Sequence, residues 1–256
     1  MSDSALYKVR GVTFGEGRPK ICLPLVSADL AALRRDVQDL LALPFDLAEW
    51  RVDCFAAFRD ETAVREALGL LRRTLGDKPL LFTFRSLPEG GQAELSPEDY
   101  RALNLLAAGS GLVDLVDVEL FQLDKAPLAG LVDELHRRQV GVVISSHDFA
   151  RTPSKDAMVY RLQLARRLGA DLPKLDVMPR QPEDVLALLE ATVEANRLGC
   201  GPLITMSMGA LGGVSRLAGE TFGSAMTFGC AGQASAPGQY PAGELCSILD
   251  SLHRHQ

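Results

Sequence analysis

The chain has few cysteines and no pattern among them. The five lie apart at positions 22, 54, 200, 230 and 246, and no Cys-x-x-Cys occurs. An odd and scattered set is typical of reduced thiols in a cytosolic protein, and argues against a disulfide framework or a zinc site. No apolar run approaches the roughly 20 residues that span a bilayer. No signal-peptide hydrophobic segment follows the polar start of the chain. These absences predict a soluble, cytoplasmic protein.

The chain also has fewer basic than acidic residues. Lys and Arg total 27 against 33 Asp and Glu, which leaves a net charge of −6. No basic block or stripe is present, so the chain is not expected to bind nucleic acid or an anionic membrane surface. No Gly-x-Gly-x-x-Gly follows the first expected strand, which argues against a dinucleotide-binding open sheet.

The sequence does contain a regular alternation of strand-like and helix-like segments. Short apolar runs at 20–25, 45–52, 79–84, 112–120, 139–145, 172–178, 202–206 and 224–228 read as strands. Helical spacing occupies 29–43, 61–75, 97–108, 128–138, 154–168, 181–198, 215–219 and 242–253. About eight strand-then-helix units predict an α/β fold, a single (β/α)8 TIM barrel forming one domain over residues 1–256. A doubly wound sheet is the alternative. Residues 7–13 with the turn at 15–17 predict a short N-terminal β-hairpin.

Residues able to do chemistry stand at the expected strand ends. Active sites of (β/α)8 barrels are built at the C-terminal ends of the strands, so these residues should meet in one place. They are Glu49, Arg51, Arg85, Glu89, Asp117, Glu119, His147, Lys174, Met206, Met208, Arg216, Phe228, Ser235 and Gln239.

Lys174 lies inside an apolar run. Burying an ammonium costs several kcal/mol unless it is paired, which favours the neutral amine, a carbonyl nucleophile. The alternative is a lysine that reaches the barrel rim and pairs with Glu119 or Asp176. His147 ends the preceding strand, and an imidazole can take and give a proton near neutrality. The pair favours an enzyme that forms a Schiff base, although His147 could instead be a structural histidine bonded to Asp148 or to a backbone carbonyl.

Three arginines stand at rim positions: Arg51, Arg85 and Arg216. Their guanidinium groups offer planar forks for a carboxylate, so convergence on one face would indicate an anionic, hydroxyl-rich substrate. Each could also be an ordinary surface ion pair of small value. Glu49 and Glu89 could bind hydroxyls, orient the histidine, or balance the arginines, and spacing does not separate these roles.

Two other functions fit parts of the pattern. A Schiff-base aldolase acting on a sugar phosphate would need a phosphate clamp at the glycine-rich loop of Gly209, Gly212 and Gly213. Ala210 and Leu211 supply no charge there. A catalytically silent barrel that binds an anionic ligand would be natural if Lys174 or His147 were missing, and both are present.

Eight segments in order resemble the type I 3-dehydroquinate dehydratases of the shikimate pathway, from about Pro19 to Gln239. The segments are Glu49-Trp50-Arg51-Val52-Asp53, Phe82-Thr83-Phe84-Arg85 with Glu89-Gly90-Gly91, Ser146-His147-Asp148-Phe149, Pro173-Lys174 with Val177-Met178-Pro179, Met206-Ser207-Met208-Gly209, Ser215-Arg216-Leu217-Ala218-Gly219-Glu220, Phe222-Gly223-Ser224 and Ser235-Ala236-Pro237-Gly238-Gln239. The resemblance implies a (β/α)8 barrel, a homodimer, no metal or cofactor, and a lyase that removes water from 3-dehydroquinate in aromatic amino acid biosynthesis.

The resemblance also implies roles for individual residues. The family's Schiff-base lysine matches Lys174, its acid/base histidine His147, its histidine-supporting glutamate Glu89 and its carboxylate-binding arginine Arg216. The family's other substrate-contacting positions match Glu49, Arg51, Arg85, Met206, Met208, Phe228, Ser235 and Gln239.

The chain departs from the family pattern in three places. Pro24 stands where some members place a serine that touches substrate, and Ala210 and Leu211 replace a charged pair. Asp176 stands where a small apolar residue is usual. The two-residue period of a strand puts Asp176 on the same face as Lys174, where a carboxylate would favour the ammonium and oppose activation of the amine.

Overall fold

The computed structural model describes residues 6–232 and 235–255. Its centre is a ring of parallel strands, each hydrogen-bonded to the next in chain order. In the described part of the chain the ring comprises β3 (Lys20–Leu25), β4 (Leu47–Arg51), β5 (Leu80–Thr83), β6 (Leu115–Glu119), β7 (Gly141–Asp148), β8 (Leu172–Val177), β9 (Ile204–Ser207) and β10 (Met226–Cys230).

The ring closes between β9 and β10. A parallel bridge joins Leu203 to Ser224, and the Ala225 amide donates to the Leu203 carbonyl at 2.8 Å. On the other side of β10, Met226 to Phe228 pair with β3. The predicted TIM barrel is therefore confirmed. A short strand, β11 (Tyr240–Pro241), pairs in parallel with Gly229 and Cys230 of β10, beyond the part of β10 that pairs with β3.

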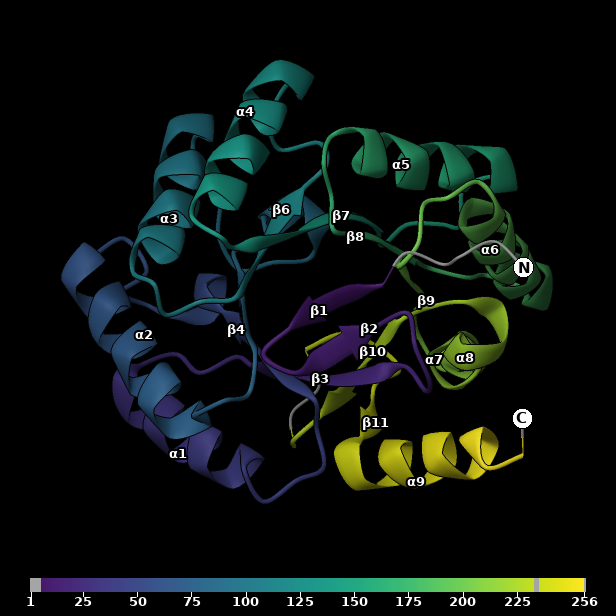
Figure 1. Ribbon diagram of the computed structural model, residues 1–256, viewed down its shortest axis with the longest axis horizontal. Coiled ribbons are helices and arrows are strands. Elements are labelled where there is room, and N and C mark those ends of the chain that lie inside the picture. Colours follow the sequence, from purple (N-terminus) through teal and green to yellow (C-terminus); the bar gives the residue numbers. More distant parts are fainter. Residues whose placement is uncertain (1–5, 233–234, 256) are drawn as a thin grey trace.

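Helices surround the ring (Figure 1). They are α1 (Leu30–Leu40), α2 (Glu61–Leu75), α3 (Pro97–Gly109), α4 (Lys125–Arg137), α5 (Lys155–Arg167), α6 (Pro182–Arg197), α7 (Gly213–Leu217), α8 (Gly219–Phe222) and α9 (Ala242–His253), with 3-10 turns η1 (Val52–Cys54) and η2 (Leu87–Glu89). Several begin at a side-chain cap: Asp60 accepts from the Thr62 amide at 2.8 Å, and Ser96 from the Asp99 amide at 3.1 Å. Such caps satisfy amides that the first helical turn leaves free. No helix of the described residues is both long and apolar enough to cross a membrane.

The predicted N-terminal hairpin is present as β1 (Tyr7–Val9) and β2 (Val12–Phe14), and it lies over the centre of the ring (Figure 1). Phe14 is fully buried against the apolar residues of the barrel interior. Gly141 opens β7 beneath the hairpin, where an added Cβ would lie 1.9 Å from the hydroxyl of Tyr7. The hairpin therefore caps the apolar end of the barrel.

Inward-facing side chains change from apolar to polar along the strands. On β7 the sequence is Val143, Ser145 and His147; on β8 it is Leu172, Lys174 and Asp176. Side chains at every second position share a face of the strand. The apolar residues pack under the hairpin, and the polar ones meet at the opposite end, where the C-termini of the strands lie.

Candidate active site

One cavity lies at the C-terminal ends of the strands, and every residue to which the family resemblance gave a catalytic or binding role lines it. Asp117 and Glu119, also expected at the strand ends, are buried outside the lining. The lining includes Glu49, Arg51, Arg85, Glu89, His147, Lys174, Met206, Met208, Arg216, Phe228, Ser235 and Gln239. These residues come from strands β4, β7, β8, β9 and β10, from the residues just after β5 and β9, from turn η2, from helix α7 and from the loop before β11. The barrel topology thus brings together side chains spread over 191 positions of the chain, from 49 to 239.

Lys174 lies on the inner face of β8 and is 5% exposed. Its Nζ is 3.8 Å from Asp117 Oδ2 and 3.7 Å from Asp176 Oδ2, and it stands 4.4 Å from the centre of the Phe228 ring. These carboxylates attract the amine, but both lie beyond hydrogen-bond distance. The amine is therefore held in the cavity by the apolar wall and by charge, and its nitrogen makes no hydrogen bond to the described residues.

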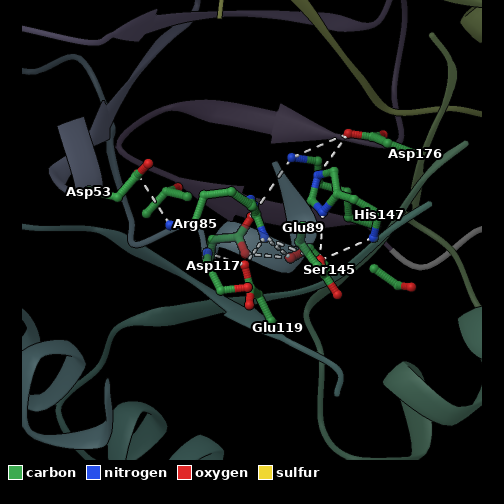
Figure 2. A network of polar contacts seen from close by, with 12 residues as sticks. Asp53, Arg85, Glu89, Asp117, Glu119, Ser145, His147 and Asp176 are labelled. Carbon is green, nitrogen blue, oxygen red and sulfur yellow. Dashed lines mark hydrogen bonds and ion pairs between the residues drawn. The ribbon is translucent and has the colours of Figure 1, made fainter. Parts of the chain in front are cut away.

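His147 is held by carboxylates on both edges of its ring (Figure 2). Nδ1 lies 2.8 Å from Glu89 Oε2, and the same oxygen accepts from the His147 backbone amide at 3.1 Å. Nε2 lies 3.0 Å from Asp176 Oδ2. Asp148 instead accepts the backbone amides of the following turn, so it is not the partner of the ring. Of the three roles considered for Glu89, its contacts favour orienting the histidine.

Arg85 is the centre of a buried charge network (Figure 2). One terminal nitrogen contacts Glu119 at 3.0 Å and Ser145 at 2.9 Å, and the other contacts Asp117 at 2.8 Å. Burial would lower the pKa of Arg85, but the facing carboxylates more than offset this and raise it well above its ordinary value. Burial likewise would raise the pKa of Asp117, and the cations, Arg85 first, bring it below the ordinary value. Most hydrogen-bond donors of the Arg85 guanidinium are thus taken up by neighbouring side chains of the protein.

Arg51 and Glu49 on β4 are also fixed by neighbours. Arg51 makes a two-pronged contact with Asp53, with both distances 2.8 Å, and Asp53 also accepts the Arg85 amide at 3.2 Å. Despite its burial, Asp53 has a pKa below the ordinary value because of the Arg51 fork. Glu49 accepts a hydrogen bond from Thr83 Oγ1 at 2.8 Å. These bonds hold the two charged groups in fixed positions at the cavity wall.

Arg216 approaches the cavity from α7. It donates to the Pro237 carbonyl at 3.1 Å and contacts the sulfur of Met206 at 3.0 Å, while its Nε is buried without a hydrogen-bond partner among the described residues. Burial lowers the pKa of Arg216, and Asp176 partly offsets that effect. An unpartnered donor on a buried cation suits an anionic group of a ligand.

The loop before β11 covers the same side of the cavity. Gln239 Nε2 donates to Ser235 Oγ at 2.9 Å, and Gln239 Oε1 accepts from the Ser235 amide at 2.9 Å. Gly238 has φ +80°, and a Cβ there would lie 2.4 Å from the carbonyl oxygen of Gly209. Only glycine allows this close crossing of the two loops without strain.

The family model for type I 3-dehydroquinase matches residues 21–256. The chain belongs to the type I 3-dehydroquinase family. The 3-dehydroquinate dehydratase of Syntrophotalea carbinolica is 54% identical to it over 250 residues, covering 97% of this chain and 98% of the relative. That of Bacillus licheniformis is 51% identical over 251 residues, covering 98% of each chain.

Solved structures of the family have the same fold. The type I 3-dehydroquinate dehydratase from Clostridium difficile, solved with covalently modified comenic acid, matches with a TM-score of 0.95 and 45% identity, covering 99% of each chain. The 3-dehydroquinate dehydratase from Geobacillus kaustophilus matches with a TM-score of 0.95 and 41% identity over the full length of both.

Some residues at this type I 3-dehydroquinase cavity were not among the predicted site residues. Gly90 and Phe149 line it together: Gly90 has φ +87°, and a Cβ there would lie 2.4 Å from the Phe149 ring. The sequence signal for both is their position beside Glu89 and His147. Asp176 also lines the cavity, which confirms that it shares a face with Lys174. Of the other departures, Pro24 is buried outside the lining, and Leu211 is 44% exposed.

Proposed function

We propose that this type I 3-dehydroquinase removes water from 3-dehydroquinate to give 3-dehydroshikimate, through a Schiff base on Lys174 with His147 as general acid and base. The observation that carries the proposal is that an amine and an imidazole face one cavity and approach the same carboxylate oxygen. Asp176 Oδ2 lies 3.7 Å from Lys174 Nζ and 3.0 Å from His147 Nε2.

The chemistry follows from that pair. The neutral amine of Lys174 adds to the C3 ketone and loses water to form an iminium, which withdraws electrons and acidifies the proton on C2. His147 takes that proton and leaves an enamine. The enamine expels the C1 hydroxyl while His147 returns the proton to it, so that water leaves from the face on which the proton was removed. Hydrolysis of the imine then frees the product and restores the amine.

Each group in this scheme has support in the contacts. Glu89 would keep the ring of His147 in one orientation through Nδ1, which is how a carboxylate commonly fixes the tautomer of a catalytic histidine. Proton transfer by such a positioned group contributes roughly 10²–10⁴-fold to a rate. The remaining barrier would fall through the iminium itself.

The binding groups divide by chemistry. Arg216, with its unpartnered Nε, would hold the substrate carboxylate. Glu49, Arg51, Arg85, Ser235 and Gln239 would meet hydroxyl and ring oxygens at the cavity wall. Met206, Met208 and Phe228 would form the apolar surface against the carbon ring.

The proposal extends to the whole chain as a single barrel domain that works as a homodimer in the cytoplasm, without a metal or cofactor. The cysteines Cys22, Cys54, Cys200, Cys230 and Cys246 are free thiols, which agrees with a reducing compartment. Light scattering of the purified protein at working concentration tests the dimer, for which a monomer mass would be the contrary result.

The test is turnover of 3-dehydroquinate, followed by the absorbance of the conjugated enone that dehydration creates. Wild type should produce the signal, and Lys174→Met should reduce it to background because the substitution removes the nucleophile but keeps an apolar stem. Lys155→Met is the matched control: Lys155 is a partly exposed lysine at the start of α5, outside the cavity, that pairs with Glu194. Turnover that survives in Lys174→Met would remove the proposed mechanism.

A further inference from the structure

The carboxylate of Asp176 contacts the two proposed catalytic groups and little else. Its Oδ2 lies 3.0 Å from His147 Nε2 and 3.7 Å from Lys174 Nζ, and Oδ1 is buried with no hydrogen-bond partner among the described residues. A buried carboxylate that supported the fold would be expected to bond backbone amides or an arginine. Among the described residues, the Asp176 carboxylate forms hydrogen bonds and ion pairs only with His147 and Lys174.

The pairing of β7 with β8 places Asp176 beside His147 and Lys174. In the parallel register of β7 and β8, Ser145 is opposite Lys174 and His147 is opposite Asp176. Asp176 is two residues beyond Lys174, so both point into the barrel. The position of the carboxylate is therefore set by the backbone of two central strands, and it is 8% exposed.

Besides Asp176, four charged groups surround the pair. Glu89 faces His147 from η2, and Asp117 faces both His147 and Lys174 from β6. Arg85, two residues after β5, lies 3.6 Å from Glu89, and Arg216 on α7 acts on Asp176 through its charge. Burial would raise the pKa of Asp176, but Lys174 and His147 lower it below its ordinary value, so the carboxylate is an anion at neutral pH.

We propose that Asp176 is a positioning residue for the dehydration: it holds the Nε2 edge of His147 toward Lys174 and stabilises the charged forms of both. It would thereby set the pH range in which the imidazole acts as a base and the amine as a nucleophile. The inference rests on the proposed function of Lys174 and His147, and adds a third group to the pair.

The sign of its effect follows from its charge. An anion near two cations makes each keep its proton to a higher pH, so removing the anion lets both release protons at lower pH. An opposite charge within 4–6 Å typically moves such a midpoint by about one to three pH units. The substitution Asp176→Asn should therefore move the whole pH profile of kcat/KM to lower pH by roughly one unit. A merely structural role would lower the height of the profile and leave its position unchanged.

Two measurements on the intact protein test this. The first is the pH profile of kcat/KM for wild type, Asp176→Asn and a control, Asp148→Asn. Asp148 follows His147 on β7, accepts the Ala150 and Arg151 amides, and does not line the cavity. The profile should move for Asp176→Asn and stay in place for the control. An unmoved profile in both variants would overturn the inference.

The second measurement does not need turnover. With ¹⁵N-labelled histidine, the titration of His147 can be followed directly, because the chain has 4 histidines and His147→Gln identifies the signal. The midpoint should fall by about one unit in Asp176→Asn, and an unchanged midpoint would reject the role. Asp176→Ala, which needs less space, repeats the test if the amide variant does not fold. Failure of wild type to turn over substrate would reject the proposed function alone.

Discussion

Replacing Arg85 with Met should destabilise the protein strongly, because it leaves buried carboxylates without their cation. The Arg85 side chain is 4% exposed and contacts Asp117, whose side chain is fully buried, and Glu119, which is 1% exposed. Breaking a buried pair by removing one partner costs about 3–5 kcal/mol. Met fills most of the space, so the loss of packing adds little. At roughly 2–4 °C per kcal/mol for a chain of this size, Tm should fall by about 6–20 °C.

The loss should depend on pH in a defined direction. In wild type the pKa of Asp117 is held below its ordinary value, so its ion pair stabilises the fold above that value and weakens only in acid. Without Arg85, burial dominates and raises the pKa of Asp117 in the folded state. The folded variant then binds more protons than the unfolded chain near pH 5, and its stability rises as pH falls from 7. The difference between variant and wild type should therefore be smaller at pH 5 than at pH 7.

Fluorescence of the single tryptophan reports the unfolding. Trp50 is fully buried, with its ring 5.7 Å from those of Phe55 and Phe82. Thermal or urea unfolding at pH 7 and pH 5 compares wild type with Arg85→Met and with Arg65→Met, a control in the exposed Arg65–Glu61 pair of α2. A Tm change for Arg85→Met no larger than that of the control, or a loss that grows toward pH 5, would refute this account of the network.

Two further predictions concern Arg216, the proposed partner of the substrate carboxylate, and Gly141 at the apolar end of the barrel. Arg216→Ala should raise KM for 3-dehydroquinate by about 10-fold or more, because a hydrogen bond to a charged group contributes about 1.5–3 kcal/mol. An unchanged KM in steady-state kinetics would show that Arg216 does not hold the substrate. Gly141→Ala should lower Tm, because its Cβ would meet the Tyr7 hydroxyl at 1.9 Å; the double variant with Tyr7→Ala should lose less than the sum, and strict additivity would contradict the contact.

The sequence predicted the barrel well where local signals and burial agreed. The strand at 20–25 and the helix at 61–75 have the bounds expected for them. An apolar run delimits the strand, and Asp60 and Gly76 stand directly before and after the helix, where they cap it. β7 was expected to end at Ser145 and instead continues to Asp148. A polar segment such as Ser146 to Asp148 does not have the apolar pattern of a buried strand. At the C-terminal end of the barrel it nevertheless continues β7, and each of its residues pairs with a residue of β8.

The membership of the site was predictable, and the contacts within it were not. Strand ends and family resemblance pointed to Lys174, His147 and Arg85 as neighbours of one cavity. The partners of Arg85 come from β6 and β7, which lie 32 to 60 residues away in the chain. The second carboxylate on His147 depends on the register between two strands. Such contacts follow from how elements pair in space, which spacing along the chain does not encode.

The most direct test of the mechanism is the mass of the Lys174 peptide after borohydride reduction in the presence of 3-dehydroquinate. Reduction fixes an imine as a secondary amine, so the account predicts a ligand-sized mass added at Lys174, and no addition when substrate is left out. A Lys174 peptide of unchanged mass from an actively turning-over sample, or an adduct on another lysine, would contradict it.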